Sequence, residues 1–341
     1  MTDKKLAFCG VTENVPKISV IVPVRDASQY LLQCLDSLAL QSYRNLQVIL
    51  VENGSRDNSR QLCEAYAQKD DRFEVHLCTE RGVSAARNYG LAQAQGSLIG
   101  FVDADDWVHP QMYEQLYNAL CQTGADFAAA DFWRGETPPE PARLAPVQAQ
   151  AVSQQAYAKR FFKIGSQQTL YYIWNCLFRR TALENVRFPV EFSVGEDVLF
   201  SCQAILNARK IALCNQKLYF YRCGSGVTRG FTDAMLKLPD VWEQVVQLCA
   251  QKAPQYLDYA RINCARSNFT LLTELSLGHC WKEPAYRPVV QRCLAELKAN
   301  RRLLMEADID LKRKVLIQGY CMDYRLCAAI LARASQGRNY Q

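Results

Sequence analysis

The chain has 341 residues, of which 49% are hydrophobic, enough for two domains or for one large α/β domain with a helical extension. No apolar run approaches the roughly 18 residues of a membrane-spanning helix, and the N-terminus lacks the apolar centre of a signal peptide, so we expect a cytoplasmic protein. The formal charge of +6 does not call for a nucleic-acid partner, but it is compatible with a phosphorylated substrate or an anionic membrane surface.

Strands and helices alternate through the first hundred residues. Apolar, β-branched runs predict buried strands at 18–24, 46–52, 73–78 and 97–103. Helical spacing between them predicts helices that end near Leu38, near Lys69 and at residue 95. This alternation predicts an α/β fold, a mostly parallel sheet with helices on both faces.

The remaining chain divides into a continuation of this domain and a helical region. We expect a helix after Pro110, a strand at 125–132, helices at 153–164 and 196–208, and strands near 210–214 and 217–222. Residues 135–150 are rich in Pro, Ala and Gln and predict an exposed loop, either a connector or a mobile lid. The expected parts are a tail at 1–16, an α/β domain at 17–232 and a helical region at 233–341.

Polar residues follow three of the predicted strands. Arg25 follows the first, Glu52 and Asn53 come at the end of the second, and an acidic cluster, Asp103, Asp105 and Asp106, follows the fourth. Because the carboxyl ends of parallel strands share one edge of a sheet, we expect these side chains to converge there and to form a ligand site.

The acidic cluster has two interpretations. One aspartate is ordinary in a turn, and Asp106 could cap the helix that begins near Pro110. Three carboxylates so close repel one another unless a cation lies between them. Oxygen ligands suit Mg²⁺ or Mn²⁺, which often bind one or two carboxylates together with substrate phosphates, so we predict a divalent metal site.

Two later stretches carry further candidates. In FSVGEDVLF (192–200), Ser193 and Glu196 have the spacing of a capping box, whereas Asp197 or Glu196 could instead act as a general base. In YFYRCGSGVTRG (219–230), the glycines indicate either a flexible turn or a phosphate-contacting loop with Arg222 and Arg229. The chain contains no GxxxxGK[ST] motif, which excludes a P-loop.

Taken in order, these stretches resemble the family 2 glycosyltransferases of GT-A fold. The matching segments are ISVIVPVRDASQYLLQCLDSLALQSYRNLQVILVENGSRDNS, GVSAARNYGLAQAQGSLIGFVDADDW, GEDVLF and YRCGSGVTR, spread over roughly residues 17–230. The resemblance implies transfer of a sugar, with inversion, from a nucleotide-diphosphate donor, most simply a UDP-sugar. The implied acceptor is a hydroxyl of a glycan or lipid-linked glycan in surface polysaccharide synthesis.

The resemblance also implies residue roles. Asp105 would bind the metal, and Asp103 would bind the metal or the donor ribose. Asp197 would be the general base, and Trp174 and Glu196 would lie at the acceptor. The implied nucleotide-sugar contacts are Pro23, Arg25, Glu52, Asn53, Arg87, Asp103, Arg222 and Arg229.

The sequence departs from the family pattern at Arg25, Asn53 and Cys176, which stand where Tyr, Asp and Lys are common. An Asn side chain still offers an oxygen to a base, but without charge. A non-catalytic sugar-nucleotide-binding scaffold and, less simply, a nucleotidyltransferase are the alternatives to a glycosyltransferase. A nucleotidyltransferase would usually carry a Gly- and Lys-rich loop after the first strand, and PVRDAS is not one.

Residues 311–334 combine a basic start with helical apolar spacing. This pattern is typical of a helix that packs on the rest of the protein, and also of one that rests on an anionic membrane.

Overall fold

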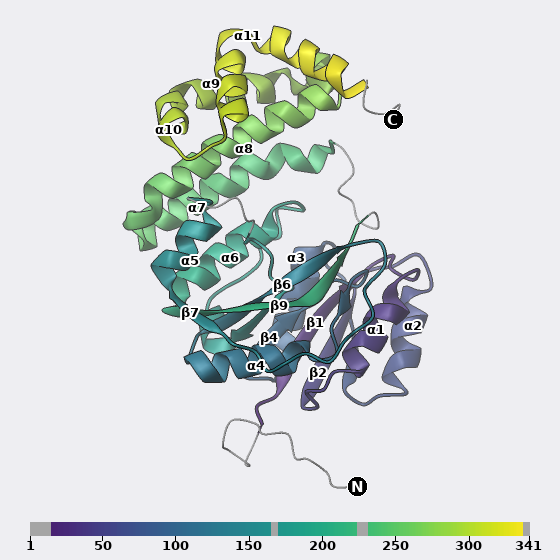
Figure 1. The fold of residues 1–341 in the computed structure, drawn as a ribbon. Coiled ribbons are helices and arrows are strands. Elements are labelled where there is room, and N and C mark those ends of the chain that lie inside the picture. The colour runs from purple at the N-terminus through teal and green to yellow at the C-terminus, as the bar shows by residue number, and fades with distance from the viewer. Residues whose placement is uncertain (1–14, 165–169, 224–230, 337–341) are drawn as a thin grey trace. The chain divides into compact units, whose positions relative to one another are not determined.

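The computed structural model describes residues 15–164, 170–223 and 231–336 (Figure 1). The chain divides into two compact units. The first comprises residues 1–157, 171–190 and 203–227, and the second comprises 158–170, 191–202 and 228–341. Helices α5 (Gln154–Phe161) and α6 (Glu196–Asn207) each begin in one unit and end in the other.

A nine-stranded sheet forms the centre of the first unit, in the order β3-β2-β1-β4-β8-β6-β9-β5, with β7 paired to β9. Strands β1 to β4 are parallel, and β8 is antiparallel to both of its neighbours. The predicted α/β fold is therefore confirmed. The strands are β1 (Ile18–Val24), β2 (Leu46–Glu52), β3 (Phe73–Leu77), β4 (Leu98–Phe101), β5 (Trp107–Val108), β6 (Phe127–Gly135), β7 (Gln150–Ser153), β8 (Cys176–Arg179) and β9 (Lys210–Arg222).

Alternate residues of each parallel strand point to opposite faces of the sheet. Both kinds of position are apolar here, and helices cover both faces. Val20, Val22 and Val48 share one core with α1 (Leu31–Ala39), α2 (Ser59–Ala67) and α4 (Met112–Thr123). Ile21 and Val51 face α3 (Val83–Gln93) on the other side. Helix α3 lies so close to the sheet that a β-carbon at Gly90 would collide with Ile21, so this position requires glycine.

Several element boundaries differ from the sequence prediction. The two strands expected near 210–214 and 217–222 are one strand, β9, whose register against β6 shifts around Asp131. The polar residues of this irregular stretch interrupt the apolar pattern without interrupting the strand. Strands β5, β7 and β8 were missed because they have only 2, 4 and 4 residues, too few to produce a periodic pattern.

A strap, residues 136–149, joins β6 to β7 without helix or strand. Three glutamine side chains of α4 and the residue before it bind its backbone. Gln111 Oε1 accepts the Leu144 N–H (2.8 Å), Gln115 Oε1 accepts the Val147 N–H (2.8 Å), and Gln122 Nε2 donates to the Val147 carbonyl (3.0 Å). These bonds favour a connector fixed along α4 over a mobile lid.

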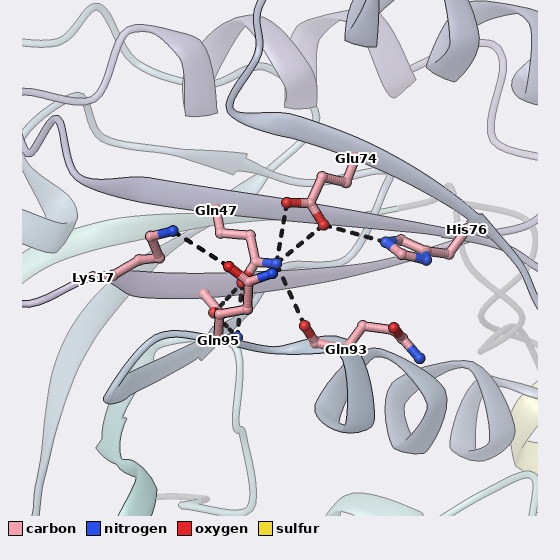
Figure 2. A network of polar contacts seen from close by, with 7 residues as sticks. Lys17, Gln47, Glu74, His76, Gln93 and Gln95 are labelled. Carbon is pink, nitrogen blue, oxygen red and sulfur yellow. Dashed lines mark hydrogen bonds and ion pairs between the residues drawn. The ribbon is translucent and has the colours of Figure 1, made fainter.

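A polar network fastens the C-terminal end of α3 to the amino ends of the strands (Figure 2). Gln47 of β2 donates to the Glu74 carboxylate of β3 (3.0 Å), and its Oε1 accepts the N–H of Gln95 (2.9 Å). The Glu74 carboxylate also meets His76 Nε2 at 3.3 Å. Because its buried polar groups bond one another, the network fixes helix and sheet without leaving polar atoms unsatisfied.

The second unit is helical, as expected for the C-terminal region. Its C-terminal helices are α7 (Leu238–Lys252), α8 (Leu257–Leu277), α9 (Arg287–Ala299), the short α10 (Arg301–Glu306) and α11 (Leu311–Gln336), with 3₁₀ turns between α7 and α8 and between α8 and α9. Leu272 of α8, Leu297 of α9 and Tyr320 of α11 belong to one buried core. By length and composition, one helix in the described part of the chain, Leu311–Arg333, could cross a membrane, although its sequence contains no uninterrupted apolar run of that length.

Candidate active site

The acidic cluster forms a tight turn, residues 103–106, which we call the carboxylate turn. It connects β4 to β5, and the Asp106 N–H donates to the Asp103 carbonyl at 3.1 Å. In the parallel register Val24 pairs with Glu52, and Ile21 pairs with Phe101 of β4. The strand ends that carry the predicted site residues therefore share one edge of the sheet, and the convergence of their side chains on a ligand stays a prediction.

Asp106 is the buried acid of the turn. Its Oδ2 accepts the Tyr219 hydroxyl at 2.6 Å, and its Oδ1 accepts the Arg222 N–H at 2.8 Å. Burial, reinforced by the charges of Asp103 and Asp105, raises the pKa of Asp106 to about 8, although both hydrogen bonds oppose the shift. The interpretation of Asp106 as a helix cap is wrong, because α4 begins at Met112 with Gln111 at the cap position.

Arg222 clamps the carboxylate turn to the surrounding elements. It is the last residue of β9 and is 7% exposed, so it lies within the strand predicted near 217–222 and not in the glycine-containing segment that follows. Its guanidinium donates to the Asp105 carbonyl (2.8 Å), to the Glu136 carbonyl (2.6 Å) and to Gln33 Oε1, and it lies 4.3 Å from the centre of the Tyr30 ring. A contact between Arg222 and a donor stays a prediction, and Arg229 lies outside the described residues.

Arg87 and Asp103 form an ion pair between α3 and the carboxylate turn. The Arg87 Nη2 and Asp103 Oδ1 atoms are 2.9 Å apart, and the guanidinium also lies over the Phe188 ring at 5.3 Å. The Arg87 side chain is 4% exposed, whereas that of Asp103 is 27% exposed. Asp103 is thus held by a buried cation while its carboxylate remains within reach of a ligand.

Asn53 fixes the loop before α3. Its Nδ2 donates to the carbonyls of Cys78 (3.2 Å) and Glu80 (2.6 Å), and its Oδ1 accepts the Gly82 N–H (2.9 Å). An aspartate could not make the two donations, which gives a structural reason for Asn at this position. The amide oxygen that was expected to meet a base already accepts a hydrogen bond from this loop. Glu52, buried beside it, accepts the Ser55 N–H at 2.5 Å.

Pro23 and Arg25 lie where β1 leaves the sheet. Pro23 is half-buried within the strand, and the exposed Arg25 stands 3.7 Å from the Asp26 carboxylate. The segment that follows is tied to the loop after β2, since the Ala27 N–H donates to Ser59 Oγ (2.9 Å) and the Ser28 N–H to Asp57 Oδ2 (2.9 Å). The two loops that flank the predicted nucleotide pocket therefore act as one piece.

We expect the Asp57→Asn variant to lose about 1 kcal/mol of unfolding free energy at pH 7, because charged acceptors form stronger hydrogen bonds than neutral ones. Burial raises the pKa of Asp57, but hydrogen bonds from Ser59 and Ser28 outweigh it and lower the pKa overall. The carboxylate therefore stabilises the fold fully above the unfolded pKa, near 4, and progressively less as the pH falls below it.

Urea unfolding of both proteins at pH 7 and at pH 3.5 measures this effect. The difference between wild type and variant should shrink at the lower pH. A difference that is constant over this range would contradict the role of the Asp57 charge.

Trp174 packs behind the carboxylate turn. It is 3% exposed, and its ring stacks on Tyr219 at 4.3 Å and on Tyr172 at 4.6 Å. The Tyr219 hydroxyl accepts the Asp103 N–H at 3.1 Å in addition to its bond with Asp106. The described contacts make Trp174 a support for Tyr219, and its predicted role at the acceptor stays a prediction.

Asp197 and Glu196 belong to the second unit, whereas the other predicted site residues that the structure describes belong to the first. They are the first two residues of α6, and Gly195 precedes them with φ +84°, a conformation that glycine adopts without strain. Because the helix begins at Glu196, Ser193 is not its cap, and the capping-box interpretation is wrong. The helix dipole favours an ionised carboxylate at this end.

The donor set of the carboxylate turn fits a divalent cation that also binds a ligand. Asp103 and Asp105 offer hard oxygen atoms, as Mg²⁺ and Mn²⁺ prefer. In residues 15–164, 170–223 and 231–336, no three His, Cys, Asp or Glu side chains are grouped to hold a metal by themselves. The remaining ligands would come from the phosphates of a bound nucleotide and from water.

The sheet order, with an acidic turn after the fourth parallel strand and a later acid at a helix start, defines a fold of the GT-A glycosyltransferase class. Residues 19–187 match the model of the family described as Glycosyl transferase family 2. Residues 19–187 of the chain therefore belong to this family.

Particular relatives agree with this assignment. The glycosyltransferase EpsJ of Bacillus subtilis is 30% identical over 213 residues, which are 61% of this chain and 61% of EpsJ. Residues 1–349 of S. aureus TarS, solved with UDP-GlcNAc, superimpose with a TM-score of 0.62 at 21% identity, covering 95% of this chain and 93% of that one.

A more distant structure shares the fold. The mannosyltransferase PcManGT of Pyrobaculum calidifontis, solved with GDP-Man and Mn²⁺, has a TM-score of 0.50 at 16% identity, covering 94% of this chain and 88% of that one. The chain spans about three fifths of the length of EpsJ.

Proposed function

We propose that the protein is an inverting glycosyltransferase that moves a sugar from a UDP-sugar to a hydroxyl group of a glycan or lipid-linked glycan in surface polysaccharide synthesis. The observation that carries the proposal is the pairing of Asp103, still reachable, with the buried Arg87 at the shared edge of β1, β2 and β4. The choice of UDP is supported by the TarS complex, since TarS shares this fold.

Asp103 and Asp105 are the residues that would hold Mg²⁺ or Mn²⁺ with the donor phosphates. When bound, such a cation supplies positive charge beside the diphosphate that leaves. Binding of Mn²⁺ by PcManGT, which shares the fold, supports this assignment.

The remaining chemistry needs a base and a rigid frame. As the acceptor oxygen bonds to the anomeric carbon, the bond from that carbon to the diphosphate oxygen breaks, and the acceptor proton passes to Asp197. Attack from the face opposite the leaving group inverts the anomeric carbon, so no protein nucleophile is required. Arg222 and Tyr219 hold the carboxylate turn in place during this step.

A thermal-shift panel tests donor and metal together. UDP-, GDP-, dTDP- and CMP-sugars are compared with and without Mn²⁺. A ligand at about 100 times its Kd stabilises by about 2.7 kcal/mol, which should raise the Tm of a chain of this size by about 4 °C. We expect this shift with a UDP-sugar and Mn²⁺, and its loss in Asp105→Ala.

The exposed Asp71 provides the matched control, since Asp71→Ala removes the same charge away from the turn and should keep the shift. If the Asp105→Ala variant shows the same rise in Tm with a UDP-sugar in the absence of Mn²⁺, the metal assignment is contradicted. The absence of a shift with every donor would contradict the proposed nucleotide site.

A further inference from the structure

The outer face of α11 is apolar and exposed. Ten large hydrophobic side chains are exposed among the described residues, and half of them lie on this one helix: Leu311 (76%), Val315 (63%), Met322 (86%), Leu326 (59%) and Ile330 (58%). Leu311, Val315 and Met322 follow one another at spacings of four and seven residues in the first half of α11, and Leu326 and Ile330 are four residues apart in the second half. Within each half these side chains therefore lie on one side of the helix. We call these five residues the apolar stripe. Such a concentration on a single helix marks an interaction surface rather than scattered surface apolarity.

The opposite face of α11 is fixed in the core of the second unit. Ile317, Tyr320, Tyr324 and Ala328 are buried there. The helix is also interrupted at Asp323 (φ −147°, ψ 94°), whose carboxylate accepts the Leu326 N–H at 3.0 Å and so starts the second half. A segment with one face in a protein core and a charged break in the middle is suited to lie on a bilayer rather than to cross it.

Cations flank the apolar stripe. Lys312, Arg325 and Arg333 are exposed, and none of them has an ion-pair partner in the described part of the chain. From 311 to 333 the helix carries five basic residues and one acidic residue, Asp323. An apolar stripe flanked by unpaired positive charges is complementary to an anionic bilayer, which has an apolar interior and negatively charged headgroups.

A groove of about 550 Å³ opens beside the middle of the stripe. Its walls include Met322 and Arg325 of α11 together with Trp281 and Lys282. The Lys282 ammonium lies 5.0 Å from the centre of the Trp281 ring, which also meets Tyr324 edge-on at 6.5 Å. Tryptophan beside a cation is typical of side chains at the boundary between lipid tails and headgroups.

We infer that α11 binds the surface of an anionic lipid bilayer, with the apolar stripe in the outer acyl region and the flanking cations among the headgroups. A second copy of the chain is the competing occupant. In a symmetric pair the same patch meets itself, so the cations beside the stripe would repel their own counterparts. Anionic headgroups would neutralise those charges. This inference goes beyond glycosyl transfer and does not depend on it.

Vesicle flotation of the full-length protein tests the inference. We expect binding to phosphatidylcholine vesicles that contain 30% phosphatidylglycerol, and little binding to phosphatidylcholine alone. The binding should weaken sharply between 50 and 500 mM NaCl, because salt screens the attraction between exposed charges.

Two sets of variants separate the apolar and charged contributions. The triple variant Lys312→Gln, Arg325→Gln, Arg333→Gln should bind anionic vesicles about a hundredfold more weakly at low salt. The double variant Leu326→Ser, Ile330→Ser should lose at least tenfold at both salt concentrations. Matched controls change three exposed cations elsewhere (Arg44, Lys69 and Lys252 to Gln) and two exposed leucines elsewhere (Leu40 and Leu77 to Ser).

Circular dichroism checks that every variant is folded, and sedimentation velocity reports self-association. The inference fails if the wild-type protein does not float with anionic vesicles, or if the controls lose as much binding as the α11 variants. It also fails if the wild type forms a dimer without vesicles that the double variant abolishes, because the stripe is then an interface between copies.

Discussion

The Asp197→Asn variant should lower the rate of sugar transfer by about 10²–10⁴-fold while leaving donor affinity unchanged. The amide has the shape of the carboxylate but cannot take a proton from the attacking hydroxyl. The start of α6 favours the ionised carboxylate, as a base requires. The rate can be followed as UDP release, with water or an added glycan as acceptor, and affinity can be followed by the thermal shift.

Glu196 is the natural control, since it lies on the same helical turn. Because Glu196 is predicted to lie at the acceptor, the Glu196→Gln variant should weaken acceptor binding but should lose much less kcat than Asp197→Asn. An equal loss in both variants would mean that the negative charge at the start of α6 matters, and not proton transfer to Asp197. If wild type and Asp197→Asn both bind donor and neither releases UDP, the protein is a sugar-nucleotide-binding scaffold and the proposed activity is wrong.

Replacing Arg222 by Met should cost about 3–5 kcal/mol of unfolding free energy. The substitution removes three side-chain hydrogen bonds from a buried cation, and it leaves the carbonyls of Asp105 and Glu136 without these donors. The Arg222→Lys variant should restore little, because an ammonium cannot reproduce the planar fork that reaches three directions. Urea unfolding gives both values.

Arg134 is the control for this substitution. It is exposed on β6 and lies over the Tyr221 ring at 5.1 Å, so Arg134→Met should cost less than about 1 kcal/mol. A stable Arg222→Met protein that no longer binds donor would contradict the clamp and return Arg222 to the role of a donor contact.

The parallel part of the fold could be predicted because its information is local. Each strand from β1 to β4 has its own apolar run, and the alternation with helices implies a shared edge for Glu52, Asn53 and Asp103. The contacts behind that edge could not be predicted. Tyr219 and Arg222 reach Asp106 because β9 pairs with β5, more than a hundred residues earlier. Hydrophobic periodicity does not encode which distant strands pair.

Two local predictions failed because a suitable residue type or spacing does not by itself determine where a helix begins. Asp106 had suitable chemistry for a cap, but a buried tyrosine and the backbone of β9 bind it. Ser193 and Glu196 had the right spacing, but α6 starts three residues beyond Ser193. A capping signature depends on where the helix begins, and sequence pattern locates that position only to within a few residues.

The conformation of the strap between β6 and β7 is fixed by residues in another part of the chain. The glutamines bind its backbone and make no use of the side chains of Leu144 or Val147. Among homologous proteins the strap should therefore vary in sequence, apart from the buried Val147 and from Leu144 and Ala149, which pack against the same core, while Gln111, Gln115 and Gln122 should be retained. A variable sequence in the strap would therefore not mean a variable structure, because glutamines in and just before α4 fix the path of its backbone.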